Sequence, residues 1–147
     1  MAEFRSKWGI NETDWVVGYT GRLVRDKGII ELVDAFQLIK ANNPKLKLLL
    51  VGMFEERDAL PQEVQDKIKN DPQIVFTDFQ NEDMEYFYAM MNVYVLMSYR
   101  EGFPTGTLEA QSMGVPVITT RVTGCCDSIV DGQTGVFVNR TPQQLAQ

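Results

Sequence analysis

The stretch from Val93 to Thr119, VYVLMSYREGFPTGTLEAQSMGVPVIT, decides the fold class of this 147-residue chain. Its apolar run Val93–Met97 predicts a buried strand, and a second run at Val115–Thr119 predicts another. The residues between them predict a loop followed by a helix over Thr105–Met113. A strand, a crossover helix and a second strand form the unit of a parallel sheet. The loop then lies at the carboxyl end of its strand, where open α/β sheets bind ligands.

The same alternation extends in both directions. Further strands are predicted at 15–20, 46–51, 74–77 and 135–138. Further helices are predicted at 28–41, at 55–70 with an interruption at Pro61, at 81–91 with Asn81 as its cap, as a single turn at 127–130, and from Thr141 onward. Uniformly apolar strands that alternate with helices predict an α/β fold, a Rossmann-like, doubly wound parallel sheet of about six strands with helices on both faces.

Composition sets limits on the class of protein. Apolar residues make up 44% and charged residues 23%, as in a soluble globular domain, and the length suffices for one core. The chain begins without the apolar segment of a signal peptide, so we expect a cytoplasmic protein, with the inner face of the membrane as the alternative. The net charge of −6 argues against a general nucleic-acid binder, so no nucleic-acid partner is expected.

The residue types that most often bind metals are scarce. Cys125 and Cys126 are adjacent, and two thiols make a poor zinc site in a chain that has no histidine. We therefore expect no metal. The absence of histidine also removes the usual general base, so any proton transfer needs another group or another domain.

Two basic residues flank the loop after the first predicted strand, Gly21–Gly28 (GRLVRDKG). Arg22 and Lys27 lie near the amino end of the next helix, where free amides and the helix dipole favour anions. An arginine fork with a lysine charge is suited to a diphosphate. The glycine spacing matches neither GxGxxG nor a P-loop. The alternative is a solvated basic loop that merely precedes a helix.

Two carboxylates lie in the stretch quoted first. Glu101 begins the loop, and Glu109 falls on the first turns of the following helix. Ionised carboxylates accept hydrogen bonds, so a pair facing one cleft suits a ligand rich in hydroxyls. The alternative is that Glu109 only favours the amino end of its helix and Glu101 is an ordinary loop residue.

Taken together, the motifs GRLxxxKG, EGFxxxxLEAxxxGxPVI, TG and DGxTGxxV resemble a known family. They are similar to those of the carboxyl-terminal, donor-binding domain of family-4 retaining glycosyltransferases. These enzymes have the GT-B architecture, in which two Rossmann-like domains face each other. The resemblance extends from Trp15 to Val138 and includes the Glu-x7-Glu spacing of Glu101 and Glu109.

The resemblance implies roles for individual residues. Arg22 and Lys27 would hold the diphosphate of a nucleotide-sugar, Glu101 would contact the donor sugar, and Glu109 would accept hydrogen bonds from the ribose. The first three would be the catalytic residues. The other donor-binding residues that it implies are Gly21, Gly52, Phe79, Gly102, Phe103, Pro104, Thr105, Gly106 and Thr107. The chain departs from the family pattern at Pro104 and Asp78, where glycine is frequent, and at Gly124–Asp127.

The implied activity is transfer of a hexose-type sugar from a nucleotide-diphosphate sugar to a glycan or lipid-linked acceptor, with retention at the anomeric carbon, in polysaccharide biosynthesis. No metal or other cofactor is expected, because charge stabilisation of the leaving diphosphate drives the reaction. Residues 1–14 are interpreted as a linker from a missing amino-terminal acceptor domain. Residues 15–147 are interpreted as the donor domain, truncated at its carboxyl end, and the isolated chain is expected to be inactive.

Two other functions fit the same residues less well. One is a non-catalytic nucleotide-binding module that keeps the fold, and the other is a doubly wound oxidoreductase or epimerase. The second lacks the glycine fingerprint of dinucleotide enzymes. The sequence leaves open the base, the sugar, the acceptor and the pathway.

Overall fold

A computed structural model describes residues 1–101, 104–122, 124–139 and 141–146. Its centre is a sheet of six parallel strands in the order β3-β2-β1-β4-β5-β6. The strands are β1 (Trp15–Thr20), β2 (Leu46–Val51), β3 (Ile74–Phe76), β4 (Val93–Leu96), β5 (Val117–Thr120) and β6 (Gly135–Val138). The predicted doubly wound parallel sheet is confirmed.

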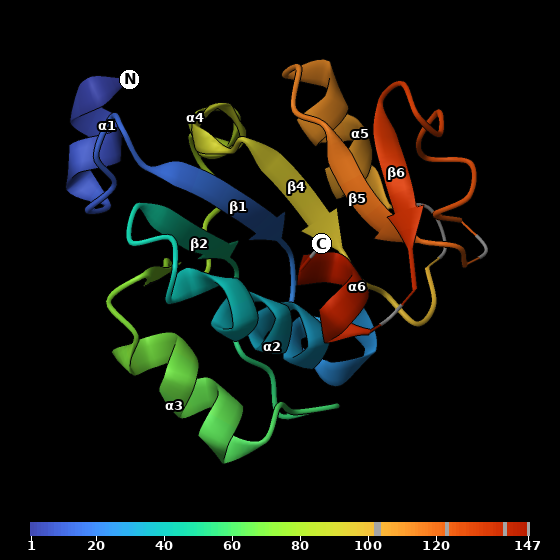
Figure 1. Ribbon diagram of the computed structural model, residues 1–147, viewed down its shortest axis with the longest axis horizontal. Helices are drawn as coiled ribbons and strands as arrows, with labels where there is room; N and C mark the ends of the chain where they lie inside the picture. The colour runs from blue at the N-terminus through green and yellow to red at the C-terminus, as the bar shows by residue number, and fades with distance from the viewer. Residues whose placement is uncertain (102–103, 123, 140, 147) are drawn as a thin grey trace.

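Helices cover both faces of this sheet, as predicted (Figure 1). They are α1 (Ala2–Lys7), α2 (Ile29–Lys40), α3 (Gln62–Asn70), α4 (Met84–Met90), α5 (Thr105–Ser112) and α6 (Pro142–Ala146), with a short 3₁₀ turn, η1 (Arg25–Lys27). α2, α3 and α6 lie on one face, and α4 and α5 lie on the other. The chain therefore winds outward from β1 in one direction and from β4 in the other, which makes the gap between these two strands the topological switch point.

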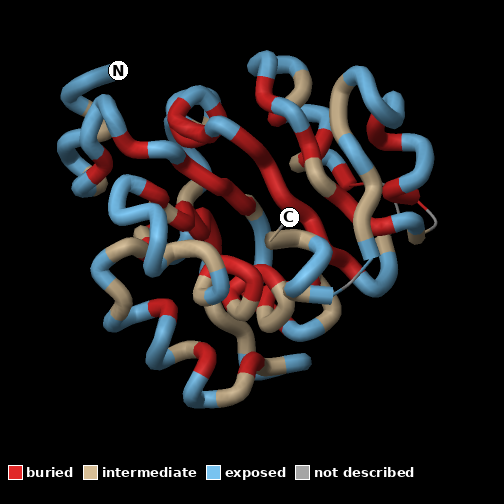
Figure 2. Tube along the Cα trace, in the orientation of Figure 1, coloured by how far each residue is buried: buried red, intermediate tan, exposed pale blue. Residues whose placement is uncertain are grey.

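The central strands are buried on both sides. Leu48, Leu49 and Leu50 follow one another in β2, and each has 0% of its surface exposed. Successive side chains of a strand point to opposite faces, so this run requires cover on both faces of the sheet. Figure 2 shows the buried residues concentrated along the middle of the sheet.

No helix among the described residues has the length and apolar character of a membrane span.

Two helices begin later than their sequence pattern predicted. α3 starts at Gln62, directly after Pro61, because proline fits the start of a helix and interrupts its interior. α4 starts at Met84 after Asp83, whose φ of 58° lies in the left-handed region. The prediction of Asn81 as the cap of this helix is therefore wrong.

Two other segments differ from their prediction. Residues 127 and 128 lie in a turn and residue 129 in a bend, so residues 127–130 form no helix. Residues 2–7 form α1, which was not predicted, and the Phe4 ring packs edge-on against Phe87 with centroids 5.0 Å apart. A six-residue amphipathic segment carries too little periodicity to be distinguished from a loop. The interpretation of residues 1–14 as a linker to another domain stays a prediction.

One glycine joins the loop after β1 to the end of β4. Gly28 has a φ of 71°, and a Cβ at this position would overlap the carbonyl oxygen of Met97. Leu32 donates its backbone N–H to the Gly28 carbonyl at 3.0 Å, so the same residue starts α2. Both the backbone conformation and the close contact require glycine here.

We expect Gly28→Ala to destabilise the protein more than Gly114→Ala does. Both glycines have a left-handed φ, 71° and 75°, but only Gly28 has a neighbour within reach of a new Cβ. Each substitution costs about 1 kcal/mol of backbone strain, and overpacking at Gly28 adds about 1–3 kcal/mol. Urea denaturation measures both free energies of unfolding. Equal losses at the two sites would show that the contact with Met97 costs nothing.

Candidate functional site

The loops that carry the predicted site residues meet at one edge of the sheet. All six strands are parallel, so the loops after β1, β2, β3 and β4 leave from the same side. The loop after β1 contains Arg22 and Lys27, and the loop after β4 contains Glu101. Because β1 and β4 are neighbours, these residues face each other across the switch point, which is where open α/β sheets bind ligands.

Two adjoining clefts open at this edge. The first has a volume of about 340 Å³ and lies between the ends of β1 and β2 and the start of α5. Its lining includes Gly21, Arg22, Gly52, Phe79, Tyr88, Thr105, Gly106 and Glu109. The second has a volume of about 250 Å³ and lies over the ends of β1 and β4. Its lining includes Tyr19, Lys27, Tyr94, Glu101 and Pro104, and it shares Thr20, Gly21, Arg22, Thr105 and Gly106 with the first cleft.

Lys27 and Glu101 form a partly buried ion pair in the second cleft. Lys27 Nζ lies 2.6 Å from Glu101 Oε1, and the two side chains are 17% and 10% exposed. The Ser98 hydroxyl donates to the same carboxylate oxygen at 2.7 Å. Two donors thus hold one oxygen of Glu101, and the pair bridges the loops that follow β1 and β4.

Glu109 is held by a chain of hydroxyl groups in the first cleft. The Tyr88 hydroxyl donates to Glu109 Oε2 at 2.6 Å. Thr20 Oγ1 lies 3.0 Å from the Tyr88 oxygen and 3.1 Å from the Tyr94 oxygen. Burial raises the pKa of Tyr94 to about 12, and burial together with the Glu109 bond raises the pKa of Tyr88 well above its usual value. Both phenols therefore stay protonated, and Tyr88 acts as a donor.

Arg22 lies where the two clefts join. Its side chain is 58% exposed, and its guanidinium lies 3.6 Å from a carboxylate oxygen of Glu55. A pair this exposed contributes little to stability. The guanidinium is therefore held close to the clefts without being committed to a strong internal partner, and an anionic ligand could take it from Glu55.

Small residues shape the floor of the clefts. A Cβ at Gly52 would overlap the carbonyl oxygen of Gly21, and a Cβ at Gly106 would overlap the Tyr94 hydroxyl. α5 begins at Thr105 without a side-chain cap, and Thr105 and Gly106 of its first turn line both clefts. Helix N-termini with free amides favour bound anions.

The structure corrects one predicted site residue. Thr107 has no exposed surface, and its hydroxyl donates to the carbonyl of Pro104 at 2.7 Å. It lines neither cleft, so its predicted role of presenting a hydroxyl to a ligand is wrong. Predicted residues Gly102 and Phe103 lie outside the described residues. The remaining predicted residues line one or both clefts.

Several residues of the site were not predicted. Tyr88 and Tyr94 lay inside the helix predicted at 81–91 and the strand predicted at 93–97, Thr20 ended a predicted strand, and Ser98 directly followed one. Polar residues at the carboxyl ends of apolar strands are a pattern that could have identified Thr20 and Ser98. The contact of Tyr88 with Glu109 joins segments 21 residues apart and depends on how α4 packs, which no local pattern reveals.

Asp78 explains one departure from the family pattern. It has a φ of 62°, in the left-handed region that glycine adopts most easily and aspartate tolerates. It pairs with Gly52 in an isolated bridge, and this contact places the following residue, Phe79, 62% exposed at the first cleft.

In the described part of the chain, no three His, Cys, Asp or Glu side chains are grouped to hold a metal ion.

Comparison with known proteins gives one consistent family. Residues 1–147 match the family described as glycosyl transferases group 1. The capsular polysaccharide biosynthesis glycosyltransferase CapM of Staphylococcus aureus is 39% identical over 127 residues, which cover 86% of this chain and 33% of CapM. The putative teichuronic acid biosynthesis glycosyltransferase TuaC of Bacillus subtilis is 31% identical over 145 residues, 99% of this chain and 34% of TuaC. The chain therefore spans about a third of the length of the curated relatives it matches.

Solved structures of similar fold include nucleotide complexes. HepE from Anabaena, crystallised with UDP and glucose, superposes with a TM-score of 0.86 at 25% identity over 99% of this chain and 40% of HepE. The C-terminal domain of the group 1 glycosyl transferase LpcC from Francisella tularensis gives a TM-score of 0.80 at 27% identity, over 97% of this chain and 77% of that domain. The Rossmann-like fold expected for the carboxyl-terminal domain of a GT-B glycosyltransferase is thereby confirmed.

We expect a measurable coupling energy between Lys27 and Glu101. A double-mutant cycle with Lys27→Met and Glu101→Gln, measured by urea denaturation, should give about 0.5–3 kcal/mol, because the pair is close and mostly buried. The exposed pair Arg121–Asp131, 3.3 Å apart and 66% and 53% exposed, is the control and should give about 0–1 kcal/mol. A coupling at Lys27–Glu101 no larger than that of the control would contradict the described pairing.

Proposed function

Because the chain belongs to the glycosyl transferases group 1 family, we propose that it forms the donor-binding half of a retaining glycosyltransferase. Its ligand is a nucleotide-diphosphate sugar, and the activity of the whole protein is transfer of a hexose-type sugar to a glycan or lipid-linked acceptor. One observation carries this proposal. The two adjoining clefts present, in order, a carboxylate, an arginine, a helix N-terminus and a lysine–carboxylate pair.

The order of these groups matches the order of chemical groups in a nucleotide-sugar. Gly52 and the exposed ring of Phe79 border the place for the base, and Glu109 offers carboxylate oxygen to the ribose hydroxyls. Arg22 and the first turn of α5 lie next, where the diphosphate belongs. The second cleft, with Lys27 and Glu101, is left for the sugar.

Tyr88 determines what Glu109 can offer. Its hydroxyl already donates to Oε2 at 2.6 Å, so Oε1 is the first oxygen available to a ribose hydroxyl. A carboxylate oxygen has two lone pairs, so Oε2 can accept a second bond as well. The buried hydroxyl chain of Tyr88, Thr20 and Tyr94 thus orients the carboxylate before a ligand arrives.

Charge stabilisation is the chemistry that these side chains can supply. As the bond to the anomeric carbon breaks, negative charge grows on the departing diphosphate, and Arg22 and Lys27 are positioned to stabilise it. The anomeric centre becomes positive, as in other glycosyl transfer reactions. Glu101 lies beside Lys27. In this proposal its carboxylate orients the sugar hydroxyls and stabilises the positive charge at the anomeric centre. With two cations in this role, we propose that donor binding requires no metal.

The relatives suggest the setting. CapM and TuaC carry names of capsular polysaccharide and teichuronic acid biosynthesis, so we propose that the whole protein acts in the assembly of a surface polysaccharide in the cytoplasm or at the inner face of the membrane. The catalytic groups that act on the acceptor belong to an amino-terminal domain in this proposal. UDP is the first nucleotide to test, because HepE was crystallised with it.

We expect the chain to bind UDP in isothermal titration calorimetry, with EDTA present. Arg22→Ala and Glu109→Gln should each weaken binding about tenfold or more, because each removes a charge-assisted hydrogen bond of about 1.5–3 kcal/mol. Lys67→Ala and Glu63→Gln on α3 make the same changes of charge on an exposed helix and should leave the affinity unchanged. No binding of UDP, GDP or ADP would refute the proposal, and so would equal losses in the control pair.

The stereochemical outcome tests the second half of the proposal. In the whole protein, NMR of the product should show the anomeric configuration of the donor sugar. The 147-residue chain alone should transfer no sugar, since it lacks the acceptor half and contains no histidine. An inverted product would contradict the retaining mechanism, and full activity of the isolated chain would contradict the division of labour between domains.

A further inference from the structure

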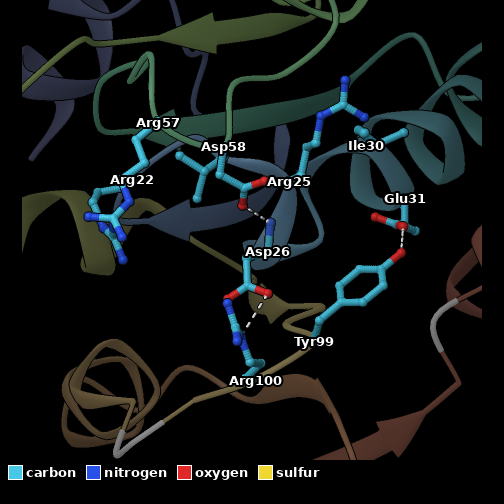
Figure 3. A pocket seen from close by; sticks show the side chains of 10 residues that line it. Arg22, Arg25, Asp26, Ile30, Glu31, Arg57, Asp58, Tyr99 and Arg100 are labelled. Carbon is cyan, nitrogen blue, oxygen red and sulfur yellow. Dashed lines mark hydrogen bonds and ion pairs between the residues drawn. The ribbon is translucent and has the colours of Figure 1, made fainter.

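A third cavity lies beside the two clefts and has a different chemistry. Its volume is about 740 Å³, within the usual range of about 300–1,000 Å³ for small-molecule sites. Four arginines line it, Arg22, Arg25, Arg57 and Arg100, and we call it the arginine basin. Figure 3 shows Arg22 and Arg57 on one side of it and Tyr99 and Glu31 on the other, with Asp26 between them.

The carboxylates of the basin are already engaged. Asp26 lies 3.4 Å from the guanidinium of Arg100, and Asp58 Oδ2 accepts the backbone N–H of Asp26 at 2.8 Å. Glu31 accepts a hydrogen bond from the Tyr99 hydroxyl. These contacts connect the loops after β1, β2 and β4 into one wall (Figure 3).

Two of the arginines have no carboxylate partner. Arg25 donates its Nε–H to the carbonyl of Ala59 at 2.7 Å, and Figure 3 shows its guanidinium at the edge of the basin beside Ile30, turned away from Asp26 and Arg100. Neither Arg25 nor Arg57 takes part in an ion pair within the described ranges. Guanidinium groups recognise carboxylates and phosphates through paired N–H donors, so unpaired arginines around one cavity suit an anionic ligand.

The remaining lining suits a saccharide. Tyr99 is 44% exposed and lines the basin with an aromatic ring, and the exposed carboxylate of Asp58, which already accepts the Asp26 amide at Oδ2, has further lone pairs that can accept hydrogen bonds from hydroxyls. An aromatic ring and a carboxylate next to unpaired arginines fit a sugar that carries an anionic group better than they fit a simple anion.

The basin adjoins the proposed place of the transferred sugar. Arg22 lines the basin and both clefts. Asp26 and Arg100 line the basin, and their chain neighbours Lys27 and Glu101 line the second cleft. A ligand in the basin would therefore lie next to the donor sugar, which is the place of an acceptor.

We propose that the arginine basin binds an anionic saccharide, and that this saccharide is part of the acceptor. The assignment to the acceptor rests on the proposed function, whereas binding at the basin does not. The anionic group is a carboxylate, as in a uronic acid, or a phosphate on the sugar. Arg57 and Arg100 bind this group, and Tyr99 packs against the sugar ring.

The test is an NMR titration of the ¹⁵N-labelled chain at constant ionic strength. The probes are glucuronic acid, glucose 1-phosphate, glucose and inorganic phosphate. We expect the arginine Nε–H and Tyr99 amide signals of the basin to shift with one of the two acidic sugars, at least fivefold more tightly than with glucose or with phosphate. The acidic sugar that binds more tightly identifies the anionic group. Equal binding of glucose or of inorganic phosphate would overturn the proposal, as would no shift with either acidic sugar.

Variants separate this inference from the proposed function. Arg57→Ala and Arg100→Ala should each lower the affinity for the acidic sugar about tenfold, which is the loss expected for one charge-assisted contact. Neither residue lines the first cleft, so UDP binding should be unchanged in both. Arg121→Ala removes an exposed arginine outside the basin and should change neither affinity. If Arg121→Ala lowers the affinity for the acidic sugar as much as Arg57→Ala does, the binding is nonspecific and the basin is not a binding site. If UDP leaves the spectrum of the unaltered chain unchanged, the proposed function fails independently of the sugar result.

Discussion

The ion pair between Lys27 and Glu101 is the interaction on which the arrangement of the site depends. It joins the loop after β1 to the loop after β4 across the point where the sheet reverses its winding direction, with 2.6 Å between the charged atoms. The contact of Gly28 with the carbonyl of Met97 brings the same two segments together one residue further on. The second cleft and the arginine basin are lined by residues of both loops, and the first cleft is lined by Gly21 and Arg22 of the loop after β1.

The charges around the junction are distributed so that a ligand can replace internal partners. Arg22 is held by Glu55 in an exposed contact at 3.6 Å, whereas Lys27 is held by a mostly buried carboxylate. A diphosphate could replace Glu55 as the partner of Arg22 with little loss of stability. Lys27 could contact the same diphosphate while its ion pair with Glu101 remains. Arg22 lines all three cavities, so its side chain could contact both a donor and an acceptor.

The sequence predicted the fold well because its pattern is strongly periodic. Six apolar runs separated by helical segments gave the strands with small errors at their ends, and the motifs placed Arg22, Lys27, Glu101 and Glu109 at one edge. What it could not predict depends on packing between distant segments. The hydroxyl chain from Tyr88 to Tyr94, the burial of Thr107 and the helix at residues 2–7 all follow from contacts that no local spacing encodes. The arginine basin was hidden for the same reason, since its arginines come from three loops.

A crystal structure of the chain with UDP tests the central claim most directly. The account predicts the ribose hydroxyls within hydrogen-bond distance of Glu109 and the diphosphate in contact with Arg22 and with the first turn of α5. It also predicts that Lys27 keeps Glu101 within an ion-pair distance, with the arginine basin left open beside the terminal phosphate. UDP bound elsewhere on the molecule, or bound at this edge without contact to Glu109 and Arg22, would contradict it.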